Sequence, residues 1–350
     1  MRSFHFNGSR IVKTGIAIFL TAIICEWFNW PPVFAVITAI VTIEPTVSDS
    51  IKKGLIRFPA SAIGSAFAVF FITLFGNSPI TYTLAAVATI LVCYRLNLHA
   101  GLLVATLTAV AMVEVIHSNY LFAFFIRLGT TTIGLLVSTI VNMLVFPPNY
   151  RRDIVENIKR ISERAGTIME RTFRTILYDA HTNRGDELKT IKQLTKEIKK
   201  TETLIHFQRN ESKLYPWVRG KENELLMAEK QLLFLHNLEF HLGALLNIPE
   251  QHISWTSEER DRIMQAVTEL ADDLKHSIDY DPKKHESQLK NVTDIFWDDN
   301  KEITNSEDRH PSQFPPEFVV LYELITIYNL VDQFYEPSSV KLTPTAKESK

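Results

Sequence analysis

Two arginines and two glutamates stand in an otherwise apolar part of the sequence, where charged groups can bind anions or carry protons. Arg127 follows Tyr120 by seven positions and is expected inside the hydrocarbon zone of a membrane, where a guanidinium costs at least about 2.5 kcal/mol. Such a residue usually faces a cavity or a partner. With Arg57, it predicts a path that attracts anions from both sides. The structural alternatives are pairing of Arg127 with Glu114, its extension to the outer headgroups, and a role for Arg57 as a cytoplasmic anchor.

The acidic and hydroxyl residues near these arginines have several possible roles. Glu44 and Glu114 can neutralise the arginines, carry protons or cap broken helices, and pairing is the role that we favour. Ser61 follows Arg57, and Thr131 follows Arg127 together with two neighbouring threonines. These hydroxyls predict the lining of a polar path, although threonine in a span commonly bonds its own helix.

Gly64 and Gly134 lie in the same two apolar segments as the arginines. Small residues at these positions let neighbouring helices approach closely in lipid. We therefore expect both glycines to serve helix packing, and a direct contact with a substrate is the less favoured interpretation.

The charges of the chain are unevenly distributed between its two parts. Residues 1–150 hold eight Lys or Arg and four Asp or Glu, whereas residues 151–350 hold 29 and 35. This division predicts a membrane domain at residues 1–148, followed by a water-soluble domain at residues 149–336 and a disordered tail at residues 337–350.

Uncharged runs predict about six membrane spans. Residues 58–94 contain no charged side chain, which is far more than the about 20 residues that cross a bilayer once. The turn-forming cluster at residues 76–79 divides this run into two spans. A run at residues 128–150 closes at Pro147-Pro148 and predicts the last span. The other three spans are expected near residues 11–28, 32–50 and 97–116, with Pro45 interrupting the second.

The positive charges fall on one side of the membrane if the spans number six. They precede the first span, lie between spans two and three and between spans four and five, and follow span six, whereas the loops near Asn29, Asn77 and Asn119 have none. Positively charged loops tend to remain in the cytoplasm. We therefore expect a multi-pass protein of the plasma membrane, with both termini and the soluble domain in the cytoplasm.

The membrane region also contains an internal repeat. An offset of 70 residues, without gaps, matches three uncommon residue types in register: Glu44 with Glu114, Arg57 with Arg127 and Gly64 with Gly134. Each copy holds three spans, an odd number, so the second copy must enter the membrane from the opposite side. Many transporters are inverted repeats of this kind, with the substrate site where the copies meet near the midplane. The sequence therefore predicts a 3+3 inverted repeat.

After Pro148 the pattern changes to that of amphipathic helices. Apolar residues recur at spacings of three and four along residues 154–172, with charged residues between them, and similar stripes run through the rest of this part. They predict a helical bundle, so the fold class is all-α throughout. Residues 280–316, rich in Asp, Asn and Pro, are expected to be rich in loops.

Several kinds of chemistry have no motif in this sequence. It contains no glycine-rich phosphate loop of the form GxxxxGK[ST] and no HExxH pattern, so ATP hydrolysis, a metal site and a cofactor are not expected. The soluble part is mildly acidic, which disfavours nucleic acid as a partner. We therefore do not expect an enzyme, and transport would be driven by a gradient or be passive.

Residues 1 to about 148 resemble the aromatic acid exporter superfamily, which includes the fusaric acid resistance proteins and the plant aluminium-activated malate transporters. The resemblance is carried by the Glu44-Pro45 break, the segment KKGLIR at residues 52–57, Gly64, and residues 127–134 ahead of the proline pair. The whole chain looks like the single-repeat bacterial members, called aromatic acid exporter family member 1, whose C-terminal helical domain has a family of its own.

This resemblance implies six spans arranged three plus three, a homodimer, and passage of organic anions such as aromatic carboxylates. It also implies that Arg57 and Arg127 lie near the path. The resulting hypothesis is a plasma-membrane exporter or channel for small organic anions, whose partners are the lipid bilayer, the anion and a second copy of the chain. The alternatives are a membrane-anchored helical scaffold and a membrane sensor, neither of which transports anything.

Overall fold

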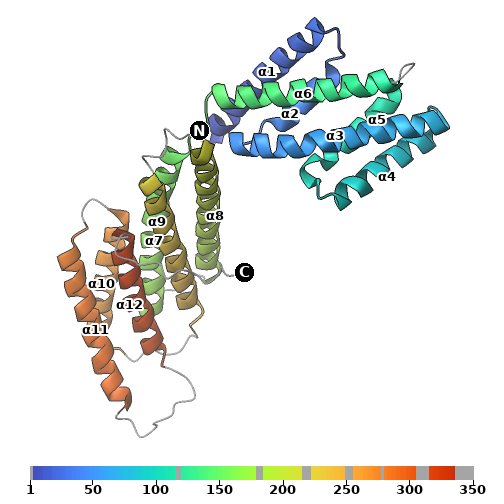
Figure 1. Cartoon of the computed structure of the whole chain (residues 1–350). Helices are drawn as coiled ribbons and strands as arrows, with labels where there is room; N and C mark the ends of the chain where they lie inside the picture. The colour runs from blue at the N-terminus through green and yellow to red at the C-terminus, as the bar shows by residue number, and fades with distance from the viewer. Residues whose placement is uncertain are drawn as a thin grey trace, which may run out of the picture. The chain divides into compact units, whose positions relative to one another are not determined.

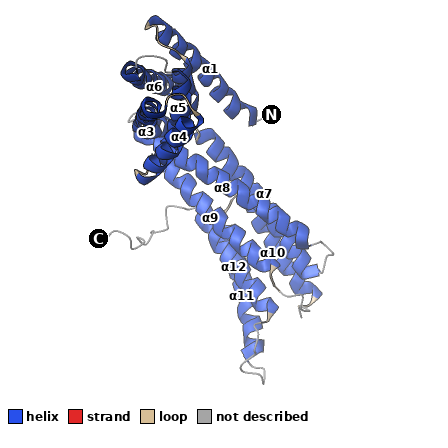
Figure 2. Cartoon of the chain, turned by 90° about the vertical axis from the view of Figure 1, so that its right-hand side faces the viewer, coloured by secondary structure: helices blue, strands red, loops and turns tan. Residues whose placement is uncertain are grey.

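The computed structural model describes residues 3–115, 120–178, 184–214, 222–248, 255–276, 280–304 and 315–335, and the elements in these ranges are all helices (Figure 1, Figure 2). The predicted all-α class is therefore confirmed for the described part of the chain. The chain divides into two compact units, Met1–Asn149 with Asn210–Tyr215, and Tyr150–Arg209 with Pro216–Lys350. The tail predicted to be disordered lies outside the described residues.

The first unit consists of apolar helices: α1 (Ser3–Trp27), α2 (Val33–Thr42), α3 (Val47–Phe75), α4 (Pro79–Arg95), the short η1 (His99–Gly101), α5 (Leu102–Val115) and α6 (Tyr120–Leu144). By length and composition, Gly8–Trp27, Val47–Phe75 and Tyr120–Leu144 can cross a membrane, whereas α2, α4 and the segment His99–Glu114 are shorter apolar helices. The ten residues of α2 cover about 15 Å, about half of the hydrocarbon core. Three helices of spanning length and three shorter ones thus occupy the region where the sequence predicts six spans.

The turn between α3 and α4 lies where the sequence predicts it. Gly76 ends α3 with a φ of 63°, a conformation that glycine adopts without strain. The Ser78 side chain then accepts a hydrogen bond from the backbone N–H of Thr81, and Pro79 occupies the first turn of α4. Both residues are typical of helix starts, because a cap satisfies a free N–H and proline has none to satisfy.

The prediction of a second span at residues 32–50 and a third from residue 58 is wrong in its boundaries. α2 ends at Thr42, and α3 begins at Val47, so Lys53 and Arg57 belong to α3 and not to a loop. The cause is a helix cap, since the Thr46 hydroxyl accepts a hydrogen bond from the backbone N–H of Asp49 at 3.0 Å. The last span also begins earlier than residue 128, within α6.

Helix packing in this unit depends on two close approaches. α3 packs against α5 and α6, and α6 also packs against α2. A Cβ atom on Gly64 would lie 2.3 Å from the carbonyl oxygen of Ala105, and one on Gly134 would lie 2.4 Å from that of Ala35. Both distances are far below van der Waals contact, so only glycine fits. The two contacts have the same form, because their members lie 70 residues apart in pairs.

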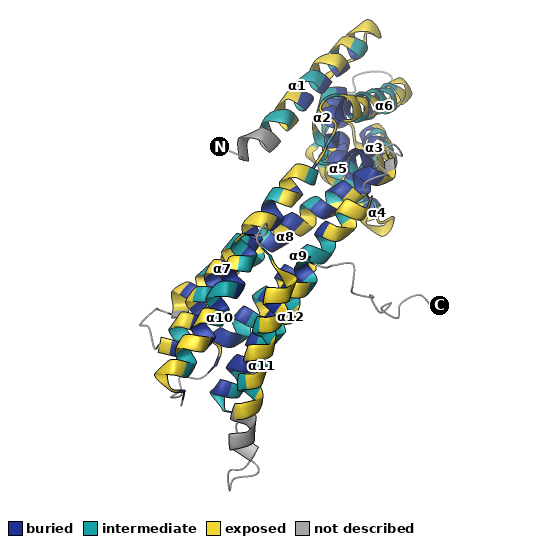
Figure 3. Cartoon of the chain, turned by 90° about the vertical axis from the view of Figure 1, so that its left-hand side faces the viewer, coloured by how far each residue is buried: buried dark blue, intermediate teal, exposed yellow. Residues whose placement is uncertain are grey.

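The second unit contains α7 (Arg151–Tyr178), most of α8 (Arg184–Leu214), α9 (Glu222–Leu246), α10 (Ser257–Lys275), α11 (Pro282–Thr304) and α12 (Pro316–Tyr335). Buried and exposed residues share each of these helices (Figure 3). The predicted stripe at residues 154–172 is buried, and it joins one hydrophobic core with residues of the other helices. The interpretation of this stripe as core is confirmed.

The prediction of a loop-rich segment at residues 280–316 is wrong for most of its length. α11 occupies Pro282–Thr304 and presents the buried Val292, with the partly buried Leu289 and Ile295, to the core. Their spacing of three is the helical signal, and the acidic residues after them obscured it. Residues 305–314 of this segment lie outside the described residues.

Enlarging either close-contact glycine should destabilise the first unit. We expect Gly64→Ala and Gly134→Ala to lower the free energy of unfolding by about 1 to 3 kcal/mol each, because the added methyl group meets a backbone carbonyl that cannot move aside alone. Thermal unfolding of the detergent-purified protein measures the effect. Gly15→Ala is the matched control, since nothing lies within 4 Å of its Cβ position. Equal unfolding temperatures for all three variants would contradict this account of the packing.

Candidate functional site

Arg127 is the most deeply buried charge of the first unit. It lies in α6 with 3% of its surface exposed, and its guanidinium carbon stands 4.3 Å from the centre of the Phe34 ring of α2. Its Nη2 donates a hydrogen bond to the hydroxyl of Thr108 in α5. Its Nε and Nη1 are buried and have no hydrogen-bond partner within the described residues. A positive charge with free donors is thus enclosed by apolar helices.

Hydroxyl groups from three helices meet beside this guanidinium. The Ser61 hydroxyl of α3 lies 3.3 Å from that of Thr131 in α6 and 3.4 Å from that of Thr108. Thr131 donates its own proton to the backbone carbonyl of Arg127 at 2.8 Å, as does Thr130 at 3.0 Å. The hydroxyls therefore satisfy one another and their own helices. None of them carries a charge that could neutralise the guanidinium.

The corresponding arginine of the first half has a different environment. Arg57 donates from Nη2 to the Glu44 carboxylate at 2.7 Å and from Nε to the Ala100 carbonyl at 3.3 Å. Lys53 binds the other oxygen of Glu44 at 2.9 Å. Glu44 thus neutralises Arg57, as the sequence leads us to expect.

Glu114, the counterpart of Glu44, does not pair with Arg127 in the described structure. Its carboxylate accepts a hydrogen bond of 2.5 Å from the Tyr82 hydroxyl of α4. The predicted site residues therefore form three groups: Arg127 with Ser61 and Thr131, Arg57 with Glu44, and Glu114 with Tyr82. Gly64 and Gly134 lie at the helix contacts described above.

Sequence reasoning misses the side chains that hold the break between α2 and α3. Asn142 of α6 donates to the Glu44 carbonyl at 3.1 Å and to the Ser50 hydroxyl at 2.9 Å. The Lys13 ammonium of α1 donates to the Asn142 side chain at 2.9 Å. The ends of a broken helix carry free polar groups, and these bonds satisfy them. A buried amide at the end of an uncharged run is the one signal that could have found Asn142.

Phe34 and Thr108 are the other residues of the site that the sequence does not reveal. Both stand among apolar or small residues of their helices, and their importance comes from Arg127, which is distant in the sequence. No local pattern distinguishes them from core residues. Thr108 matches Thr38 at the offset of 70 residues, but that coincidence is cheap in an apolar sequence.

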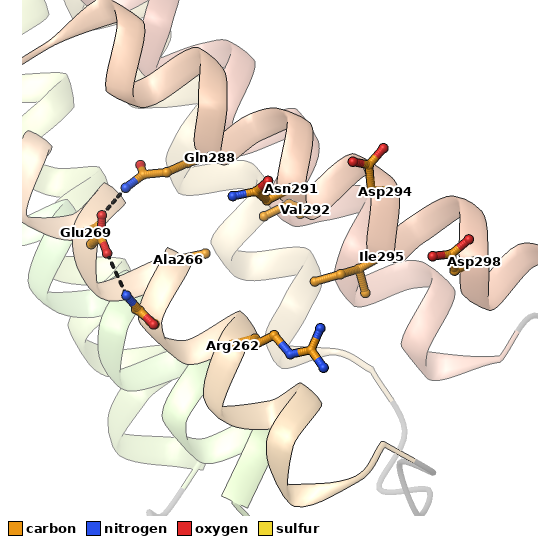
Figure 4. A pocket seen from close by; sticks show the side chains of 10 residues that line it. Arg262, Ala266, Glu269, Gln288, Asn291, Val292, Asp294, Ile295 and Asp298 are labelled. Carbon is orange, nitrogen blue, oxygen red and sulfur yellow. Dashed lines mark hydrogen bonds between the residues drawn. The ribbon is translucent and has the colours of Figure 1, made fainter.

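The second unit contains a cavity of about 430 Å³ between α10 and α11 (Figure 4). Glu269 on its wall is bound by Lys284 at 3.1 Å, by Gln265 at 3.1 Å and by Gln288. Burial tends to raise the pKa of Glu269, but these hydrogen bonds and the charge of Lys284 hold that pKa below its ordinary value. This carboxylate is already satisfied, and no group of three metal-binding side chains occurs among the described residues.

Comparison with known proteins adds to this picture. The profile of aromatic acid exporter family member 1 matches residues 5–145. A UPF0421 protein of Oceanobacillus iheyensis is 46% identical over 336 residues, which cover 96% of this chain and 97% of the relative. The chain belongs to the aromatic acid exporter family. It is therefore a membrane protein of a transporter family.

Other relatives extend the similarity beyond the membrane unit. A UPF0421 protein of Bacillus cereus is 35% identical, covering 95% of this chain and 94% of its own length. One of Staphylococcus haemolyticus is also 35% identical, covering 94% and 96%. The soluble unit thus accompanies the exporter unit in these proteins, and their shared name specifies no substrate.

The two arginines of this family member should respond oppositely to neutral substitution. Arg57→Met leaves Glu44 with Lys53 alone and should lower stability by about 1 to 3 kcal/mol. Arg127→Met removes an unpaired buried charge and should leave the unfolding temperature unchanged or raise it. Thermal unfolding in detergent compares the two variants with the parent protein. A loss of stability in Arg127→Met equal to that in Arg57→Met would mean that Arg127 has a partner in the native state.

Proposed function

We propose that this protein is an exporter or channel of the plasma membrane for small organic anions, driven by a gradient or passive, and that it works as a homodimer. The observation that carries the proposal is the Arg127 guanidinium, which is buried with two nitrogens that lack hydrogen-bond partners in the described structure. Membership of a transporter family supports the same conclusion.

The energetics of Arg127 explain why an anion would bind there. A guanidinium inside a membrane is costly, and each buried donor without a partner adds about 1 to 3 kcal/mol. Phe34 offsets part of this cost through its ring face, by about 0.5 to 2 kcal/mol. A carboxylate is the ligand that relieves the rest, because it supplies both the opposite charge and acceptors. Hydrogen bonds between a guanidinium and a carboxylate are among the strongest in proteins.

Aromatic carboxylates are the substrates that we propose within this class. The family name points to them, and Phe34 offers an aromatic surface next to the guanidinium on which a substrate ring can pack. The neighbouring hydroxyls of Ser61 and Thr108 add donors and acceptors for a polar substituent on that ring. Glu44 with Arg57 would form a second charged station on the path.

We also propose that the membrane domain, residues 1–148, consists of six spans in a 3+3 inverted repeat. Ser61 and Thr131 are 70 residues apart and approach each other at 3.3 Å, as equivalent positions beside a two-fold axis would. The two glycine contacts support the repeat in the same way, since each is the counterpart of the other. In such transporters the substrate site lies where the copies meet.

The orientation of this proposal comes from the charges of the sequence. With six spans, the lysines and arginines gather on one side, which would be the cytoplasm. Both termini and the helical domain of residues 149–336 would then be cytoplasmic. That domain would assist assembly or gating.

Anion flux tests the proposal. Proteoliposomes containing the intact protein should take up 4-hydroxybenzoate under an imposed proton gradient faster than protein-free liposomes. Arg127→Ala should reduce this flux at least tenfold, because the binding charge is lost. Lys52→Ala is the control, since it removes one exposed positive charge of α3 outside the site and should retain the flux.

Two results would overturn the transport proposal. Full flux in the Arg127→Ala variant would remove Arg127 from the path. No flux with any tested anion, from protein that unfolds cooperatively and is therefore folded, would favour a membrane-anchored scaffold or a sensor, for which a buried arginine needs no anion.

A further inference from the structure

The first membrane helices contain two charge pairs with the same spacing. Glu44 precedes Arg57 by thirteen residues, and Glu114 precedes Arg127 by the same number. In the first pair the charges meet at 2.7 Å. In the second pair no ion pair forms in the described structure, and Tyr82 holds the carboxylate at 2.5 Å. Two equivalent pairs are thus present in opposite states.

Tyr82, Glu114 and Arg127 are connected through one hydrophobic cluster. Phe34, Met112 and Val113 belong to this cluster, and Tyr82 packs against it. Phe34 carries the guanidinium of Arg127 on its ring, and Glu114 follows Val113 directly in α5. The carboxylate of Glu114 therefore borders the same cluster of side chains as the unpaired guanidinium.

We propose that Glu114 is a built-in carboxylate that competes with the transported anion for Arg127, and that Tyr82 holds Glu114 away while the site is open. This inference rests on the proposed function. The state without anion would resemble the first pair, with Glu114 on Arg127 as Glu44 is on Arg57. An arriving carboxylate would displace Glu114, which then receives the Tyr82 hydroxyl. The guanidinium is neutralised both before and after the exchange.

The proposal makes Tyr82 a positioning residue whose effect can be measured as competition. A hydrogen bond to a charged group shifts an equilibrium by about tenfold. Without it, Glu114 spends more time on Arg127, and the anion meets an occupied site. A site that is competent for only part of the time binds proportionally more weakly. The loss should disappear when Glu114 can no longer compete.

Calorimetric titration of the detergent-purified full chain with 4-hydroxybenzoate tests this. Tyr82→Phe should weaken binding about tenfold, and Tyr82→Phe combined with Glu114→Gln should restore it to the affinity of Glu114→Gln alone. That single variant should bind at least as tightly as the parent protein. Tyr94→Phe is the matched control in the same helix, exposed to 66% and away from the site, and should bind as the parent does.

The outcomes separate this proposal from the proposed function. If the parent protein binds in an Arg127-dependent manner but Tyr82→Phe binds equally well, the competition is absent and only this inference falls. The same follows if the double variant stays as weak as Tyr82→Phe, or if Glu114→Gln alone weakens binding, a measurement that does not need Tyr82→Phe to fold. If Arg127→Ala binds as the folded parent protein does, or if neither binds, the proposed function falls as well.

Discussion

Burial of a single guanidinium among apolar helices is the constraint on which the first unit depends. Arg127 is 3% exposed, and its described contacts are a hydroxyl, a ring face and its own helix. An uncompensated charge in an apolar medium is tolerated only when the surrounding structure holds it in place. α2 supplies Phe34 and α5 supplies Thr108, so two elements distant in the sequence hold one side chain. The arrangement resembles a binding site without its ligand more than a structural ion pair.

Close helix packing makes this arrangement possible. At Gly64 and Gly134 the backbones of α3 and α6 approach those of α5 and α2 so closely that a methyl group does not fit. Short side chains can then reach across the interface, as Ser61 does toward Thr131. Longer side chains at the glycine positions would separate the helices and leave the hydroxyls without partners. Packing and polarity at the centre of this unit are therefore one problem and not two.

The sequence predicts those features that depend on a local pattern or on the offset of 70 residues. The turn at Gly76 and the buried stripes of the second unit belong to the first kind, and the association of Ser61 with Thr131 belongs to the second. The start of α3 is missed because charged residues resemble a loop, although the cap at Thr46 is legible. Asn142 is missed because its partners lie more than 90 residues away, where no local pattern reaches.

The opposite states of the two charge pairs have a cause in the residues that break the repeat. Lys53 adds a second positive charge beside Glu44, and its counterpart at the offset of 70 is Ala123. Tyr82 binds Glu114, and its counterpart is Val12. The first pair is therefore biased toward closure and the second toward opening, in sequences that otherwise match. A perfectly symmetric pair of repeats would hold both arginines equally, and an anion would find no preferred station. The departures from the repeat leave Arg127 as the arginine without a carboxylate partner in the described structure.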